Sequence, residues 1–258
     1  MASSSHRPNL HEAHVRVPGS TSNLGPGFDT LGIAFRLYNH VRLTRTRGPS
    51  PSITSPIAEE AREAATRIVA DAAHAFFKLA AARPFGFDIH LSGRVPIARG
   101  LGSSVTVRLG TVAALNHLLG EPLNRPALFE LVARLEGHPD NAAAAAFGGF
   151  TASAVIDGRP RAVRLPVPAS FRFVTLVPPF EVPTEAARRL VPGEFSKADT
   201  VANLTRVALI TAAFAQGDRE ALRSAFADRI HQPYRQQLIP QLPAVIQAGE
   251  RAGALGGW

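Results

Sequence analysis

The stretch GRVPIARGLGSS, residues 93–104, decides the fold. It is a short loop with a proline and with glycines at positions 100 and 102, and it leads into Val105–Leu119. Val105, Leu109 and Val112 stand four and three positions apart, so that segment is predicted to be a helix with one apolar face. Either Ser103 or Ser104 is the expected N-cap, which places the loop at the N-terminus of this helix.

A glycine-rich loop at a helix N-terminus predicts an anion-binding site. The first N–H groups of a helix have no intrahelical partner, and the helix dipole is positive there. Glycine lets a phosphate approach the backbone closely, and a serine hydroxyl can ligate Mg²⁺ on a nucleotide. The loop is neither a Walker A loop, which needs a Gly-Lys-Ser/Thr, nor a dinucleotide fingerprint, because Val105 replaces the third glycine. An ordinary glycine-rich turn with a serine cap stays the alternative at this point.

Composition limits the class of protein. The chain has 258 residues, of which 45% are hydrophobic and 19% charged, as in globular proteins of one large or two medium domains. It contains no cysteine, which excludes disulfides, thiol catalysis and cysteine–zinc sites. Met1–His14 is polar, and no apolar run approaches the roughly 18 residues that span a bilayer. We therefore expect a cytoplasmic protein with no membrane partner.

The charge of the chain favours anionic ligands. The net charge is +8, and nearly all cations are arginines, since Lys78 and Lys197 are the only lysines. The arginines are scattered and do not alternate with aromatic residues, which disfavours nucleic-acid binding. Arginine suits bidentate capture of carboxylate or phosphate, so small anionic substrates fit this charge.

The pattern of elements predicts helices over a sheet. Before the loop we expect strands at Ala13–Val17, Ile33–Arg47 and Phe85–Leu91, a loop at Pro18–Gly32 and a helix at Glu59–Ala82. After it we expect helices at Asn124–Leu135, capped by Asn124, at Thr184–Leu190 and at 198–215, 218–230 and 240–252, with strands at Phe150–Ile156, Ala162–Leu165 and Phe171–Val177. This order predicts an α+β or α/β layer.

Two polar groups of residues stand out from this pattern. The run EGHPDN, residues 136–141, puts an acid, an imidazole, another acid and an amide between apolar segments. A capped junction, with Asp140 or Asn141 as N-cap of Ala142–Phe147, is the alternative, although a cap needs only one of the four polar residues. Asn23 and Asp29 are the strong polar groups of the loop Pro18–Gly32, and local turn chemistry is their alternative explanation.

Three separated segments together resemble one family. They are PGSTSNLGPGFDTLG at 18–32, PIARGLGSS at 96–104 and EGHPDNAAAAAFGGF at 136–150, and they are similar to homoserine kinases of the GHMP kinase superfamily. Thr184 with Arg188, and PYR at 233–235, agree with this resemblance. The resemblance covers nearly the whole chain, from about residue 13 to the end.

The resemblance implies a fold and a reaction. It implies an α+β fold of two domains: residues 1–165 as an ATP-binding domain like domain 2 of ribosomal protein S5, and residues 166–258 as a ferredoxin-like domain. It implies transfer of the ATP γ-phosphate to the hydroxyl of L-homoserine in threonine biosynthesis. It also suggests a homodimer.

The resemblance assigns roles to residues. The ATP phosphates would lie on Pro96, Arg99, Gly100, Leu101, Gly102, Ser103 and Ser104. Ser104 and Glu136 would hold Mg²⁺, which prefers oxygen ligands. Asn23 and Asp29 would bind the amine and hydroxyl of homoserine, His138 would line the same pocket, and Arg188 and Arg235 would pair with the substrate carboxylate. Asn23, Asp29 and Glu136 are the candidate catalytic residues, and Asp29 is expected to orient the hydroxyl rather than act as a base.

The sequence also departs from the family pattern. The family has a further glycine-rich segment soon after Gly-Ala-Leu-Gly-(Ala/Gly)-Trp, whereas this sequence stops at Trp258. Residues 105–107, Val-Thr-Val, replace the usual small alanines behind the phosphate loop. Two alternatives therefore remain open, namely another small-molecule kinase of the superfamily or a truncated, non-catalytic relic that binds nucleotide.

Overall fold

The computed structural model describes residues 10–48, 50–223 and 225–258. Its strands are β1 (Glu12–Asn23), β2 (Gly27–Arg45), β3 (Ser52–Ile53), β4 (Phe87–Gly93), β5 (Phe150–Ile156) and β6 (Arg159–Leu165). Its α-helices are α1 (Glu59–Leu79), α2 (Ser103–Leu118), α3 (Arg125–Glu136), α4 (Asp140–Phe147), α5 (Thr184–Arg189), α6 (Lys197–Gln216), α7 (Arg219–Leu222), α8 (Gln232–Arg235) and α9 (Leu242–Arg251), and Gln236–Leu238 forms a 3₁₀ turn. Helices and a sheet coexist, so the predicted α+β class is confirmed.

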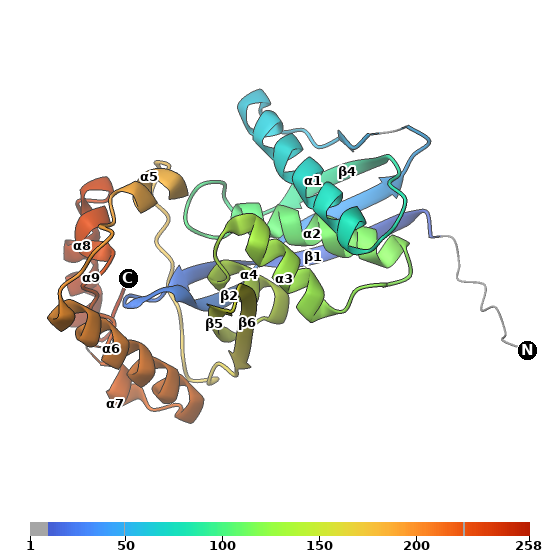
Figure 1. The fold of residues 1–258 in the computed structure, drawn as a ribbon. Coiled ribbons are helices and arrows are strands. Elements are labelled where there is room, and N and C mark those ends of the chain that lie inside the picture. Colours follow the sequence, from blue (N-terminus) through green and yellow to red (C-terminus); the bar gives the residue numbers. More distant parts are fainter. Residues whose placement is uncertain (1–9, 49, 224) are drawn as a thin grey trace, which may run out of the picture.

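The strands form one mixed sheet built around β2. The order along the sheet is β3-β4-β2-β5-β6, with β1 also paired to β2. All pairings are antiparallel except that of β3 with β4. Helices α1 to α4 cover one face of this sheet (Figure 1). Their apolar faces and the buried side chains of β1, β2 and β4 form the larger core, in which Phe76, Leu43 and Leu115 are fully buried.

The predicted loop at Pro18–Gly32 is wrong over most of its length. β1 continues to Asn23 and β2 starts at Gly27, so only Leu24–Pro26 form the turn. The pairing register shifts between Pro18 and Ser20, as it does at a β-bulge. A bulge accommodates a proline within a strand pair, and this feature cannot be read from proline and glycine counts.

The N-terminal caps of two helices differ from the prediction. The N-cap of α2 is Gly102, and neither Ser103 nor Ser104 caps the helix with its side chain. α4 begins at Asp140 after Pro139, so neither Asp140 nor Asn141 is the cap. Ser104 and Asn141 turn instead toward Glu136 and toward Ser20 and Ser22, whereas Asp140 accepts from the Asn141 N–H at 2.6 Å. The cap predicted at Asn124 is confirmed, since its Oδ1 accepts from the Ala127 N–H at 2.9 Å.

The chain after β6 packs against the N-terminal half of β2. The strand predicted at Phe171–Val177 is wrong, because this segment pairs with no strand in the described residues. Phe171 and Phe173 instead pack their rings against Phe214 of α6. The helix predicted over 218–230 is also too long, since α7 ends at Leu222.

A second core joins this part of the chain to the sheet. Phe150 of β5 stacks on Phe214 of α6 with 4.1 Å between ring centroids, and Leu24 and Leu31 of the β1–β2 hairpin are buried beside them. The tip of the hairpin projects toward the C-terminal helices (Figure 1). The domain boundary at residue 165 stays a prediction, because residues from both sides of it share this core. No helix in the described residues is long and apolar enough to cross a bilayer.

Candidate active site

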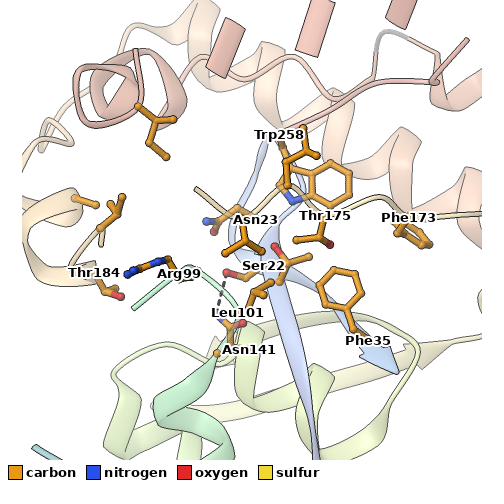
Figure 2. A pocket seen from close by; sticks show the side chains of 18 of the residues that line it. Ser22, Asn23, Phe35, Arg99, Leu101, Asn141, Phe173, Thr175, Thr184 and Trp258 are labelled. Atoms are coloured by element: carbon orange, nitrogen blue, oxygen red, sulfur yellow. Dashed lines mark hydrogen bonds between the residues drawn. The ribbon is translucent and has the colours of Figure 1, made fainter. Parts of the chain in front are cut away.

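A large cleft opens between the helix-covered sheet and the C-terminal helices. Its volume is about 1770 Å³. The N-terminal ends of α2 and α4 and the β1–β2 hairpin form one wall, and residues of α5, α8 and α9 form the other. Figure 2 shows Ser22, Asn23, Arg99, Asn141 and Trp258 around this cavity. Helix termini and hairpin turns therefore meet in one concave site, as in most small-molecule sites.

The predicted phosphate loop forms the start of α2. Gly102 has φ 66°, and a Cβ added there would lie 2.6 Å from Ser20 Oγ. The Ser20 N–H donates to the Leu101 carbonyl at 3.1 Å, which holds the loop against β1. Gly100 also has a positive φ, of 70°, but nothing lies within 4 Å of its added Cβ. The loop is thus tight on the side of β1 and open on the side of the cleft.

The base of this loop is fixed by Asn39 and Thr106. The Asn39 Nδ2 donates to Thr106 Oγ1 at 2.8 Å, and its Oδ1 accepts from the Val95 N–H at 3.1 Å. Thr106 Oγ1 donates in turn to the Ser103 carbonyl at 2.7 Å. Thr106 is fully buried with its hydroxyl paired, so the larger residues behind the loop are accommodated without an unsatisfied polar group.

Asn141 links the phosphate loop region to β1. Ser20 Oγ donates to Asn141 Oδ1 at 2.9 Å, and Asn141 Nδ2 donates to Ser22 Oγ at 3.0 Å, the bond drawn in Figure 2. Gly32 permits this approach, because a Cβ there would lie 2.5 Å from the Asp140 carbonyl oxygen. The first and third motifs of the sequence therefore meet directly in the structure.

Glu136, the last residue of α3, faces the start of α2. Its Oε2 accepts a hydrogen bond from Ser104 Oγ at 3.1 Å. Its Oε1 pairs with the guanidinium of Arg108. The Glu136 side chain is 8% exposed and that of Arg108 is 16% exposed, so this carboxylate is held in a fixed place beside the phosphate loop.

Asn23 and Asp29 lie together at the hairpin turn. Asn23 Oδ1 accepts from the Asp29 N–H at 3.1 Å. Asn23 and Asp29 have φ values of 70° and 55°, a left-handed backbone conformation that asparagine and aspartate adopt more readily than other non-glycine residues. Both residues line the cleft.

Arg188 pairs with Asp29 through two hydrogen bonds. Its Nη1 donates to Asp29 Oδ2 at 3.0 Å, and its Nη2 donates to Asp29 Oδ1. Burial alone would lower the pKa of Arg188, but the hydrogen bonds and charge of Asp29 raise this pKa above its ordinary value. The sequence predicted Arg188 as a partner of a substrate carboxylate, whereas here a carboxylate of the chain already binds it.

His138 and Asp140 form a second pair next to Asp29. The His138 Nδ1 lies 2.7 Å from Asp140 Oδ1. Burial lowers the pKa of His138, but the hydrogen bond and the negative charge of Asp140 together outweigh burial and leave this pKa above its ordinary value. Ligand atoms of Asp29, His138 and Asp140 lie within 4.8 Å of one another. The site therefore concentrates acidic groups close to Arg188.

Arg235 completes the opposite side of the cleft. Its Nε donates to the Ala187 carbonyl at 3.1 Å, and its guanidinium carbon lies 4.8 Å from the centroid of the Phe28 ring. Burial and the neighbouring positive charge of Arg188 lower the pKa of Arg235. Within residues 10–48, 50–223 and 225–258, no carboxylate forms a salt bridge with Arg235. An anion supplied by a ligand would fill this need.

Asp228 and His231 hold the hairpin turn in place. His231 Nε2 lies 2.7 Å from the Gly25 carbonyl oxygen, and its ring stacks on Phe28. Asp228 accepts from the His231 N–H at 2.7 Å and from Asn203 Nδ2 at 2.6 Å, and Asn203 Nδ2 also donates to the Pro26 carbonyl at 3.1 Å. Despite burial, the charge of His231 and these hydrogen bonds lower the pKa of Asp228.

Most site residues predicted from the sequence converge on the cleft. These are Asn23, Asp29, Arg99, Gly100, Leu101, Gly102, Ser103, Ser104, Glu136, His138, Arg188 and Arg235. Arg99 is paired with Glu181 at 3.3 Å. Pro96 starts the loop but does not line the cleft.

The sequence reasoning missed several residues of the site. Asp140 and Asn141 were considered as members of the polar run or as caps but were given no role in the site, and Arg108, Asn203 and Asp228 were not considered at all. The dense polar run at 136–141 was the signal for the first two. The position of Arg108, four residues after Ser104 on a helix, was the signal for the third.

Comparison with known proteins supports the resemblance. Residues 67–149 match the family model described as the GHMP kinases N terminal domain. The homoserine kinase of Moorella thermoacetica is 38% identical over 241 residues, which cover 93% of this chain and 81% of that protein. The homoserine kinase of Thermus thermophilus is 40% identical over 240 residues, which cover 93% of this chain and 80% of that protein.

The chain belongs to the homoserine kinase family. The crystal structure of homoserine kinase from Cytophaga hutchinsonii superposes on this chain with a TM-score of 0.83 and 27% sequence identity. The match covers 97% of this chain and 82% of the Cytophaga hutchinsonii chain. The predicted GHMP kinase fold is therefore confirmed, as is the predicted family.

Proposed function

We propose that this chain is a homoserine kinase, which transfers the γ-phosphate of ATP to the side-chain hydroxyl of L-homoserine in threonine biosynthesis. One observation carries the proposal. The N-terminus of α2, where an anion would bind, shares one cleft with a cluster of charged side chains. The cluster contains two arginines, Arg188 and Arg235, and two aspartates, Asp29 and Asp140. An amino-acid substrate has both an ammonium and a carboxylate, so a cluster with both charges suits it.

The ATP phosphates would bind at the N-terminus of α2. The first N–H groups of a helix have no intrahelical partner, so those at Gly102–Ser104 and the positive end of the helix dipole favour the phosphates. Gly100 leaves open space on the side of the cleft, so the phosphates can approach the backbone. Arg99 would add a guanidinium after leaving its exposed partner Glu181, since an ion pair of this kind contributes only about 0–1 kcal/mol.

Ser104 and Glu136 would hold Mg²⁺. A hydroxyl and a carboxylate are hard oxygen donors, and Mg²⁺ bound to a nucleotide takes few ligands from the protein. The two groups touch at 3.1 Å beside the phosphate loop, so the donors present fit this ion. When bound, the ion would offset negative charge on the phosphates.

Arg235 would bind the homoserine carboxylate, and Asn23 and Asp29 would bind its amine and hydroxyl. Arg235 is half-buried and lacks a carboxylate partner among the described residues. Arg188 has two of its N–H groups on Asp29 and keeps others for the same substrate carboxylate, because a guanidinium has five N–H donors. His138 would line the pocket and orient Asp140.

Phosphoryl transfer needs mainly positioning and charge stabilisation. The hydroxyl oxygen attacks the γ-phosphorus, the bond to the ADP oxygen breaks, and the hydroxyl proton leaves with the transferred phosphate. Asp29 accepts a hydrogen bond from the hydroxyl and fixes its direction. Both carboxylate oxygens of Asp29 already accept hydrogen bonds from the positively charged Arg188 guanidinium. This pairing favours the orienting role over proton removal.

A coupled ADP-release assay with Mg²⁺-ATP and L-homoserine tests the proposal. We expect turnover that depends on homoserine, with O-phosphohomoserine as the product. Turnover of another alcohol in place of homoserine would favour a different kinase of the superfamily. Absence of turnover with ATP still bound would favour a non-catalytic nucleotide-binding protein. The homodimer implied by the family resemblance stays a prediction. The cytoplasmic location and the absence of nucleic-acid partners, which were inferred from the composition, also stay predictions.

A further inference from the structure

Arg108 lies on the side of α2 that faces the phosphate loop. It follows Ser104 by four residues, so the two side chains share one face of the helix. Long side chains of a helix point back toward its N-terminus, which directs the guanidinium to the loop. There it pairs with Oε1 of Glu136, and Arg108 and Glu136 both line the cleft.

This pair occupies the carboxylate that the proposed function assigns to the metal. Glu136 Oε2 accepts from Ser104 Oγ at 3.1 Å and Oε1 is bound to Arg108, so both oxygens are engaged. A guanidinium stays charged at any physiological pH. Arg108 therefore provides a permanent positive charge where the divalent cation would bind.

The resting position of Arg108 leaves one donor without a partner. Its Nε is buried and makes no hydrogen bond to any described residue. Permanent buried ion pairs stabilise a protein only when the remaining donors are also satisfied. The orphaned Nε therefore makes this position costly. Arg108 lines the same cleft as Gly100–Ser104, so a guanidinium that moved into the cleft could donate to phosphate oxygens there.

We propose that Arg108 is an internal cation that holds Glu136 at the phosphate loop until a divalent metal ion displaces it. Arg108 is thus a positioning residue that sets the metal affinity of the site. The inference rests on the proposed Mg²⁺ site at Ser104 and Glu136. A fixed brace would behave in the opposite way, since its loss would misplace Glu136 and weaken metal binding.

Equilibrium binding of Mn²⁺, followed by the electron paramagnetic resonance signal of the free ion, tests this inference. The wild type and Arg108→Gln, Arg108→Met and Glu136→Gln are compared at pH 8, where an ordinary carboxyl group is ionised. The Arg108→Gln variant keeps a hydrogen-bond donor for Glu136, so it still tests the inference if the Arg108→Met variant does not fold. Arg134→Gln is the matched control, because Arg134 is an exposed arginine on α3 two residues before Glu136. Circular dichroism verifies that each variant is folded.

We expect both Arg108 variants to bind Mn²⁺ on the order of tenfold more tightly than the wild type, with Arg134→Gln unchanged. Equal or weaker binding in a folded Arg108→Gln protein would overturn the inference. An equal gain in Arg134→Gln would also overturn it, because the effect would then be one of overall charge. The proposed metal site fails separately, if Glu136→Gln binds Mn²⁺ as the wild type does.

Discussion

Substitution of Gly102 by alanine tests how the phosphate loop is held against β1. The new Cβ would lie 2.6 Å from Ser20 Oγ and 3.2 Å from Asn141 Oδ1, at a backbone φ of 66°. The left-handed backbone costs an alanine about 1–2 kcal/mol. Ser20 is fully buried, so its hydroxyl must also give up its 2.9 Å bond to Asn141, which costs about 1 kcal/mol more. We expect Gly102→Ala to lower the free energy of unfolding by about 2–3 kcal/mol.

Gly158→Ala is the matched control for this experiment. Gly158 has a φ of 70° and nothing within 4 Å of an added Cβ, so it carries the backbone cost alone. Urea unfolding should therefore show Gly158→Ala losing about 1–2 kcal/mol. ATP affinity should fall at least tenfold in Gly102→Ala and stay unchanged in Gly158→Ala, because only Gly102 shapes the loop.

The double variant Gly102→Ala with Ser20→Ala identifies the clash. Removing Ser20 Oγ removes the atom nearest to the new Cβ. The loss of stability in the double variant should be smaller than the sum of the two single losses by about 1 kcal/mol. Equal stability of Gly102→Ala and Gly158→Ala, or full additivity in the double variant, would refute this explanation of the loop.

Three further predictions concern the substrate side of the cleft and its support. Asp29→Asn should mainly raise the homoserine KM, whereas a collapse of kcat at constant KM would indicate a base. Arg235→Met should raise the same KM by about tenfold or more, the effect of one lost charge-assisted bond, with the ATP KM unchanged as the check. Burial lowers the pKa of His231, so below about pH 6.5 the unfolded state binds more protons than the folded state. The free energy of unfolding therefore decreases as the pH is lowered, by at most about 1.4 kcal/mol per pH unit. His231→Gln should flatten urea-unfolding stability between pH 7 and pH 5, and an unchanged slope would contradict this assignment.

The sequence was most informative where the pattern is local. The spacing of Val105, Leu109 and Val112 predicted α2, which the structure shows at Ser103–Leu118. Asn124 was the correct cap of α3, since the helix starts at the next residue. The motifs also predicted that segments at Pro18–Gly32 and Glu136–Phe150 would meet the phosphate loop, because similar motifs imply a shared site.

Features that depend on tertiary contacts could not be predicted in the same way. Ser104 turns to Glu136 instead of capping α2, because the tertiary partner competes with the local one. Phe171–Val177 has the composition of a strand, but its phenylalanines pack on Phe214 and no strand pairs with it in the described part of the chain. The pairing of Arg188 with Asp29 joins residues 159 positions apart, which no local pattern encodes.

The ratio of kcat/KM for L-homoserine to that for 3-aminopropan-1-ol tests the central claim most directly. The second compound has the same amine and hydroxyl but lacks the carboxylate that Arg235 would bind. ADP release measured with both compounds should favour L-homoserine by at least about a hundredfold, as expected when a buried charge loses its partner. Arg235→Met should remove most of this preference. Equal turnover of the two compounds by the wild type, or no turnover of either while ATP binds, would contradict the proposed function.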